Sequence, residues 1–228
     1  MPETIGYRSI VRASQVSSWL VGQLLKVYFA IELHAPRGLF ERGSESCLIL
    51  APMHTSALDP WLIASALRYR QWRALIPVRT LATQTFRASL RWFAPLIHLL
   101  YRAEGVIELP PKEEGGTLPE KVQGLLKALR QGDVVAIFPE GGLWKRERPP
   151  IGQFAPGVVY LQRRSGAGIV PMAVWTSDHY RPRTRYIIEV GSPVRIPEEL
   201  DLEDGARWLR EHTLELYERA RRRGETKR

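Results

Sequence analysis

Residues 47–67 read Cys-Leu-Ile-Leu-Ala-Pro-Met-His-Thr-Ser-Ala-Leu-Asp-Pro-Trp-Leu-Ile-Ala-Ser-Ala-Leu, a short apolar run, a polar turn and a second apolar run. The first run, residues 47–51, has the length and composition of a buried β-strand. Asp59-Pro60 is a typical helix start, because aspartate can cap a helix and proline is favoured at its first position. The stretch therefore predicts a strand, a turn and a helix, the repeating unit of an α/β fold.

His54 follows the predicted strand, and Asp59 begins the predicted helix. On a continuous α-helix their side chains would diverge by about 140°, so the two can meet only across a turn. A histidine beside a carboxylate can take a proton from a hydroxyl at neutral pH, because the carboxylate fixes the imidazole tautomer and stabilises the imidazolium. The alternative is that Asp59 only caps the helix and His54 is an ordinary surface histidine.

A second candidate site segment follows another apolar run. Residues 134–138 have the pattern of a buried strand and lead into Pro139-Glu140-Gly141-Gly142. A carboxylate followed by two glycines at a strand end gives the chain turning freedom and lets its backbone approach a ligand closely.

Other segments complete an alternating pattern. Strands are expected at residues 74–78, 169–175 and 185–190, and helices at residues 61–67, 119–130, 157–164 and 201–228. This alternation predicts a single α/β domain with a mainly parallel sheet covered by helices. Residues 108–117 are rich in proline, glutamate and glycine and are expected to form a loop.

The amino-terminal part of the chain is amphipathic. Apolar residues cluster within residues 10–33, but polar and charged side chains interrupt them too often for a membrane-spanning helix. The pattern favours helices lying in a membrane interface, with Trp19 and Tyr28 at the headgroup level, although the same helices could pack on the protein's own core. We therefore expect an amphipathic helical element in residues 1–40 and a catalytic domain in residues 41–228.

The His-x-x-x-x-Asp motif, followed further along the chain by Phe138-Pro139-Glu140-Gly141, resembles the glycerolipid acyltransferase family, whose best-known member is lysophosphatidic acid acyltransferase. Two shorter blocks, residues 101–105 and 170–174, fall in the family's order. The resemblance covers about residues 45–176.

The resemblance implies transfer of a fatty acyl group from an acyl thioester, either acyl-CoA or acyl-ACP (acyl carrier protein), to the hydroxyl of a lipid acceptor. The acceptor it implies first is 1-acyl-glycerol-3-phosphate, which would give phosphatidate. His54 would be the general base and Asp59 would orient it. A thioester is already activated, so neither a cofactor nor an acyl-enzyme is required, and Cys47, the only cysteine, is expected to be a core side chain.

The resemblance also implies an acceptor site. Arg102 would bind the acceptor's phosphate with bidentate hydrogen bonds, and Glu140, Gly141 and Gly142 would frame the pocket. The alternative for Arg102 is a solvated charge on the surface.

The chain departs from the family's pattern at two places. Met53 stands where the family often has asparagine, and Gly142-Leu143 replaces the usual Thr-Arg pair. Lys145 or Arg146, slightly later in the chain, could supply the missing phosphate-binding charge. Otherwise the acceptor is not a lysophosphatidate. A separate alternative is a non-catalytic lipid-binding relative, against which the intact His54 and Asp59 argue.

Charge and composition limit the partners. Lys and Arg total 33 against 24 acidic residues, a formal charge of +9 that attracts acidic partners such as an anionic membrane surface, a CoA thioester or acyl carrier protein. No nucleic-acid-binding module and no metal-ligand spacing is present, so we expect neither nucleic acid nor metal as a ligand. The family's habit of embedding an amino-terminal helical element implies a peripheral or monotopic protein at the cytoplasmic face of the membrane.

One further stretch has several interpretations. Residues 83–100 combine aromatic and aliphatic residues with arginines and are expected to form one or two helices broken near Pro95. They could line an acyl groove, meet the bilayer or pack in the core. His98 lies in this stretch without a carboxylate at a comparable place, so we expect it to be a structural or surface residue.

Overall fold

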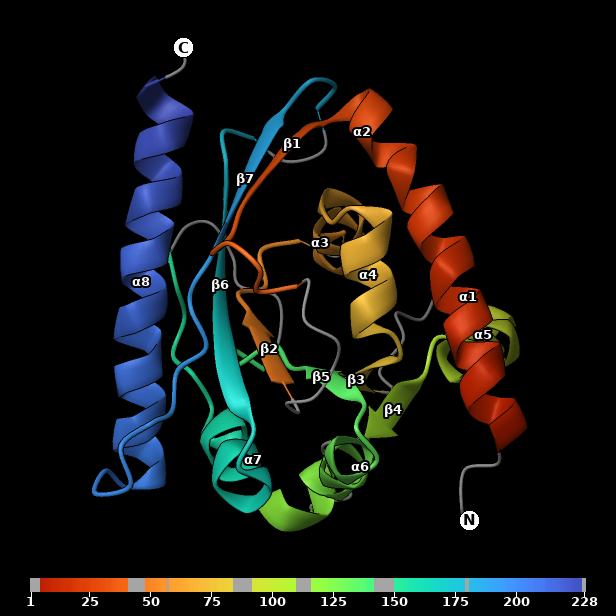
Figure 1. Cartoon of the computed structure of the whole chain (residues 1–228), viewed down its shortest axis with the longest axis vertical. Helices are drawn as coiled ribbons and strands as arrows, with labels where there is room; N and C mark the ends of the chain where they lie inside the picture. The colour runs from red at the N-terminus through yellow and green to blue at the C-terminus, as the bar shows by residue number, and fades with distance from the viewer. Residues whose placement is uncertain are drawn as a thin grey trace.

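The computed structural model describes residues 5–40, 48–56, 58–83, 92–109, 116–141, 150–178 and 181–226. Within these residues the chain forms a seven-stranded sheet in the order β1-β7-β6-β2-β5-β3-β4 (Figure 1). The strands are β1 (Ala30–His34), β2 (Leu48–Pro52), β3 (Val78–Thr83), β4 (Val106–Leu109), β5 (Val134–Ala136), β6 (Gly168–Thr176) and β7 (Arg185–Val190).

Most of the sheet is parallel. Strands β4, β3, β5, β2 and β6 run in one direction, whereas β7 is antiparallel to β6 and carries β1 parallel to itself. The prediction of an α/β domain built on a mainly parallel sheet is confirmed.

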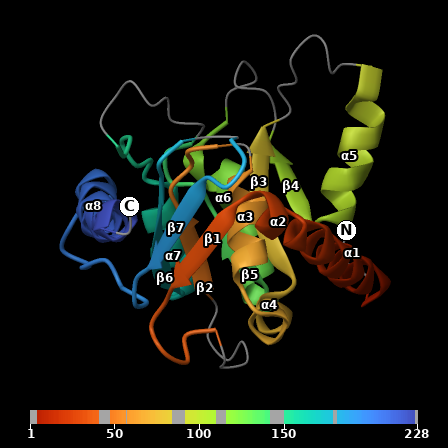
Figure 2. The same ribbon diagram turned by 90° about the horizontal axis from the view of Figure 1, so that it is seen from above.

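Helices cover both faces of the sheet. They are α1 (Ile5–Gln23), α2 (Leu25–Tyr28), α3 (Asp59–Ala66), α4 (Tyr69–Leu75), α5 (Ala94–Ala103), α6 (Leu118–Arg130), α7 (Gly157–Ser165) and α8 (Leu202–Thr226). Helices α1, α3 and α4 lie on one side and α6, α7 and α8 on the other (Figure 1), while α5 stands beside β4 at one end of the sheet (Figure 2).

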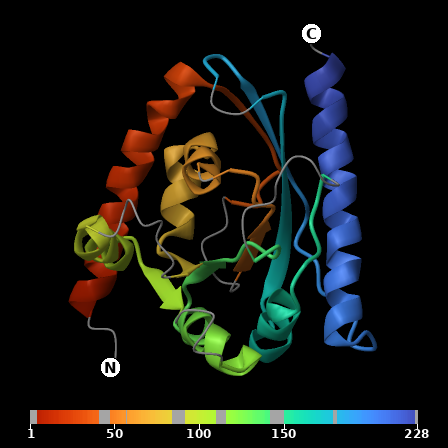
Figure 3. The ribbon, with the colours of Figure 1, turned by 180° about the vertical axis from the view of Figure 1, so that it is seen from behind.

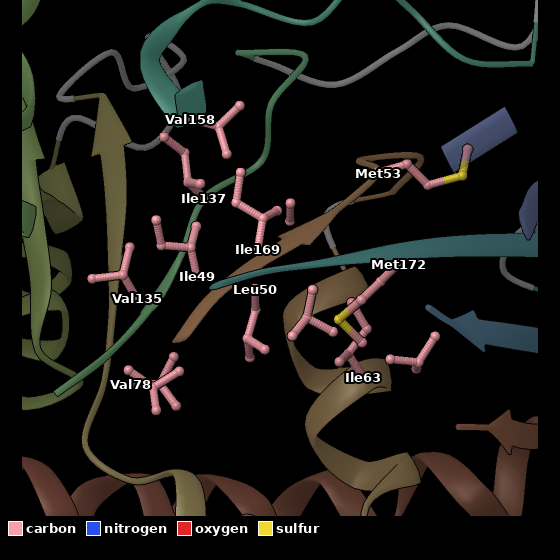
Figure 4. Packing of buried hydrophobic residues seen from close by; sticks show 14 of the residues in the cluster. Ile49, Leu50, Met53, Ile63, Val78, Val135, Ile137, Val158, Ile169 and Met172 are labelled. Atoms are coloured by element: carbon pink, nitrogen blue, oxygen red, sulfur yellow. The ribbon is translucent and has the colours of Figure 1, made fainter. Parts of the chain in front are cut away.

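The buried strand β2 lies at the centre of the core. Its side chains alternate between the two helical layers, with Ile49 on the side of Val158 in α7 and Leu50 on the side of Ile63 in α3 (Figure 4). Because both of its faces are covered, β2 is apolar throughout, as the sequence predicts. The strand delivers His54 to its carboxyl end.

Two expected elements differ from the structure. The strand expected at residues 74–78 is wrong, because α4 continues to Leu75 and β3 begins only at Val78. The loop expected at residues 108–117 begins too early, because Glu108 and Leu109 belong to β4. Residues 110–115 lie outside the described part of the chain.

The amino-terminal residues are built into the domain. Residues 1–40 contain, besides the expected helices, strand β1, which pairs with β7 from Ala30 to His34. Trp19 packs inward rather than at an interface, and its indole N–H donates to the Leu67 carbonyl oxygen at 3.2 Å. The expected division at residue 40 is therefore not a boundary of the sheet.

Candidate active site

The site lies where two adjacent parallel strands end. His54 follows β2, and Phe138-Pro139-Glu140 follow β5, the neighbour of β2 in the sheet. Open α/β sheets bind their ligands at this edge, outside the carboxyl ends of the strands.

The turn of residues 54–56 folds around the carboxylate of Asp59, which is completely buried. Its Oδ2 accepts hydrogen bonds from the backbone N–H groups of Thr55 at 2.6 Å and Ser56 at 2.8 Å. Its Oδ1 accepts the Ser56 hydroxyl at 3.0 Å. These bonds offset the cost of burying a charge.

Asp59 also orients His54. The imidazole Nδ1 lies 3.2 Å from Asp59 Oδ2, and the His54 ring stacks on Phe138 with ring centroids 4.1 Å apart. With the Nδ1 proton donated to Asp59, Nε2 is the ring nitrogen that can accept a proton. The interpretation of Asp59 as only a helix cap does not hold, since Leu58 is the N-cap of α3 and the Asp59 carboxylate turns back to the preceding residues.

Glu140 binds backbone from two directions. Its Oε2 accepts the backbone N–H of His54 at 2.9 Å, and its Oε1 accepts the backbone N–H of Gly152 at 3.0 Å. Burial raises the pKa of the Glu140 carboxyl above its ordinary value, and the two N–H groups oppose this rise. Glu140 thus fixes the His54 backbone, a role that the sequence did not indicate.

The structure does not bring Arg102 to this site. Val106 of β4 is level with Thr80 of β3, which is level with Ala136 of β5 and so with Leu50 of β2. Arg102 comes before Val106 in the chain and so lies toward the amino ends of these strands. His54 comes after Leu50 and lies at their carboxyl ends. Three strand spacings, about 14 Å in all, also separate β4 from β2.

The structure therefore places Arg102 apart from His54, and its acceptor-binding role stays a prediction. Arg102 lies in the last turn of α5, near the amino ends of the strands, with its side chain exposed. Tyr7 of α1 donates a hydrogen bond to the Arg102 carbonyl oxygen at 2.9 Å. An exposed side chain at this place fits the alternative of a solvated charge.

Of the other expected site residues, Gly141 lies within the described part of the chain and the rest do not. Gly141 is exposed and has a φ of +67°, a conformation that favours glycine. Gly142, Lys145, Arg146 and Cys47 lie outside the described residues.

A second histidine–carboxylate pair links α5 to β4. His98 Nδ1 lies 2.5 Å from Glu108 Oε2, a carboxylate ten positions later in the chain. The pair joins a helix to a strand that the sequence did not reveal, which is why spacing alone missed it.

Comparison with known proteins identifies the family. The acyltransferase family model matches residues 31–175, which contain the two site segments and the central strands. The chain belongs to the acyltransferase family.

A solved structure shares the fold of this acyltransferase. The crystal structure of the 1-acyl-sn-glycerophosphate acyltransferase PlsC from Thermotoga maritima matches with a TM-score of 0.62 at 15% identity, over 96% of this chain and 84% of that chain. The family match shows that the chain is an acyltransferase, and the similarity to this structure confirms the fold. Among the described residues of this acyltransferase, no helix has the length and apolar character needed to span a bilayer.

Proposed function

We propose that this acyltransferase moves a fatty acyl group from an acyl thioester to the hydroxyl of a lipid acceptor, with His54 as general base. One observation carries the proposal. The His54 imidazole is held through Nδ1 by a buried carboxylate at the carboxyl edge of a parallel sheet, with Nε2 left as proton acceptor.

The chemistry needs one base and no covalent enzyme intermediate. His54 Nε2 takes the proton of the acceptor hydroxyl while the hydroxyl oxygen attacks the thioester carbonyl carbon. The tetrahedral intermediate collapses, the carbon–sulfur bond breaks, and the thiolate receives the proton from the imidazolium. Asp59 stabilises that imidazolium, and proton transfer by a positioned base contributes about 10²–10⁴-fold in rate.

For the acceptor, we propose 1-acyl-glycerol-3-phosphate. Support comes from the name of the Thermotoga maritima protein and from Lys145 and Arg146, cations in the segment that follows Glu140. Gly141 and Gly142 would let backbone approach the acceptor. Acyl-CoA and acyl carrier protein are the proposed donors, and no cofactor is proposed.

We further propose that this acyltransferase binds the cytoplasmic face of a membrane through an apolar surface on α1, α2, α5 and the residues just before α2 and α5. It consists of Ile10, Leu20, Val21, Leu24, Val27, Tyr28, Trp92, Phe93, Leu96, Leu99 and Leu100. All are exposed, and Trp92 reaches 91% exposure. Helix α5 contacts α1 (Figures 1 and 3), and exposed apolar side chains of this kind favour binding at a membrane interface.

Thiol release from palmitoyl-CoA tests the reaction and its acceptor together. We expect release that requires 1-acyl-glycerol-3-phosphate and yields phosphatidate. If thiol release depends on monoacylglycerol or a lysophosphatidylcholine instead, the proposed acceptor is wrong and the proposed reaction class is kept. Absence of release with either palmitoyl-CoA or palmitoyl-acyl carrier protein, with every acceptor, would favour the alternative of a non-catalytic lipid-binding relative.

A further inference from the structure

We propose that Arg210 of α8 is a positioning residue for His54, acting through the Ile151–Gly152 peptide and Glu140. The inference rests on the proposed function, since it concerns the base of that reaction. It assigns a role in the site to the carboxyl-terminal helix, which lies outside the residues that the family model matches.

The first link joins α8 to the segment that leads into α7. Arg210 Nε donates to the Gly152 carbonyl oxygen at 2.8 Å, and its Nη2 donates to the Ile151 carbonyl oxygen at 3.1 Å. This segment runs beside α8 (Figure 3). Two donors of one rigid guanidinium fix two successive carbonyl groups, which a single-donor side chain cannot do.

The second link uses the same peptide group. The peptide between Ile151 and Gly152 accepts from Arg210 through its oxygen and donates from its N–H to Glu140 Oε1 at 3.0 Å. Hydrogen bonds to the two ends of one peptide polarise it and strengthen each other. Arg210 therefore both places and strengthens the donor that holds Glu140.

The third link reaches the base. The other oxygen of Glu140 accepts the His54 backbone N–H at 2.9 Å, while the His54 ring is held by Asp59 at 3.2 Å. Backbone and ring of His54 are thus fixed by different carboxylates. One of these, Glu140, is itself oriented from α8.

Another arginine of α8 serves as a control for Arg210. Arg207, one turn earlier, forms an ion pair with Asp204 of its own helix and has a side chain 69% exposed. Arg207→Ala is therefore a matched control for Arg210→Ala, since it removes a guanidinium from the same helix without touching residues 151–152.

A double-mutant cycle on kcat tests the proposal in the full-length protein. We expect Arg210→Ala to lower kcat about 10-fold, the lower end of the range for residues that orient a catalytic group, with little change in the KM of either substrate. Arg210→Lys, which keeps a positive charge but loses the planar fork of the guanidinium, is expected to fall between wild type and Arg210→Ala. Arg207→Ala is expected to keep wild-type kcat.

Coupling to Glu140 separates positioning from general stability. In a Glu140→Gln background, Arg210→Ala should change kcat by less than about 2-fold, because the link to His54 is already broken. If Arg210→Ala lowered kcat by the same factor in the Glu140→Gln background as in the wild type, the proposal would be overturned. A wild-type kcat in Arg210→Ala alone would also overturn it. Wild-type enzyme assayed in parallel distinguishes the two failures: without acceptor-dependent thiol release it is the proposed function that fails.

Discussion

At the residue scale, the site depends on how a buried charge is stabilised. The Asp59 carboxylate is removed from water, and the backbone N–H groups of Thr55 and Ser56 and the Ser56 hydroxyl satisfy it. The same contacts shape the turn that carries His54. Folding of the turn and orientation of the base are therefore two results of one carboxylate.

Asp59→Asn is expected to lower kcat about 10²-fold or more, because the amide can neither fix the Nδ1–H tautomer nor stabilise the imidazolium by charge. Steady-state thiol release measures the effect, and a thermal melt checks that the variant folds. Asp204→Asn, which changes a 46% exposed side chain on α8, should behave as wild type. A kcat for Asp59→Asn within a few-fold of wild type would contradict the role of Asp59.

Glu140 should give stability a specific pH dependence. Burial raises its pKa, so the folded protein holds this proton more tightly than the unfolded chain does. The free energy of unfolding should therefore fall as pH rises from the ordinary carboxyl range through the raised pKa. Urea unfolding from mildly acidic to neutral pH measures this change. The free energy of unfolding of Glu140→Gln should not show the decrease that the wild type shows. Parallel pH curves for the two proteins would refute the expectation.

Sequence reasoning succeeded at this scale where chemistry is local. His54 and Asp59 lie on one turn, and their meeting could be predicted from five positions and a helix start. The position of Arg102 could not be predicted, because it depends on the direction of β4, a short strand that carries Glu108 among its four residues. The backbone bonds of Glu140 have no sequence signal, since any residue can supply the N–H groups.

At the element scale, α5 stands out as a helix at the edge of the domain. None of its residues is buried, and its contacts are with β4 and α1 at the edge of the domain. The interpretation of this stretch as core is therefore wrong for residues 94–103. The His98–Glu108 pair helps to hold the helix to β4 while its apolar side chains stay exposed.

Replacing Trp92 and Leu96 together by alanine is expected to weaken membrane binding. Burial of a large apolar side chain is worth about 1.5–3 kcal/mol, so the partition coefficient should fall about 10-fold or more. Cosedimentation with vesicles of phosphatidylcholine and phosphatidylglycerol measures it. Gln123→Ala, an exposed change on α6 across the sheet, is the control. If the wild type, the Trp92/Leu96 double variant and Gln123→Ala bound vesicles equally, α5 and the residues just before it would not be part of the membrane surface.

Elements with strong apolar periodicity were predictable and the edge strands were not. Runs such as those of β2 and β6 are buried on both faces and leave a continuous apolar signal. Strand β1 lacks buried residues and follows two helices, so its sequence was interpreted as part of a helical segment.

At the scale of the whole molecule, α1 is fastened to the domain by polar contacts. Gln15 bonds both backbone groups of Val78, accepting from its N–H at 3.0 Å and donating to its oxygen at 2.6 Å. Buried Asp133 pairs with Arg8 of α1 and, at 2.9 Å, with buried Arg79 of β3. The amino-terminal helix is thus part of the folded unit, whatever surface it presents to a membrane.

Asp133→Asn is expected to destabilise the protein by about 3–5 kcal/mol, because it leaves the buried Arg79 guanidinium without its carboxylate. Urea unfolding measures the loss. Arg8→Gln should cost less, since the Arg8 side chain is 32% exposed and its removal keeps the Arg79–Asp133 pair. The expectation would be contradicted if Asp133→Asn unfolded at the wild-type midpoint.

The role of His54 as general base is tested by the rate of acceptor-dependent thiol release of His54→Ala, with His212→Ala as control. His212 lies on α8, where its ring contacts Trp208. We expect kcat to fall about 10²–10⁴-fold for His54→Ala at an unchanged melting temperature, and His212→Ala to keep the wild-type kcat. Wild-type turnover by folded His54→Ala would show that another group removes the proton, and the general-base mechanism would be wrong.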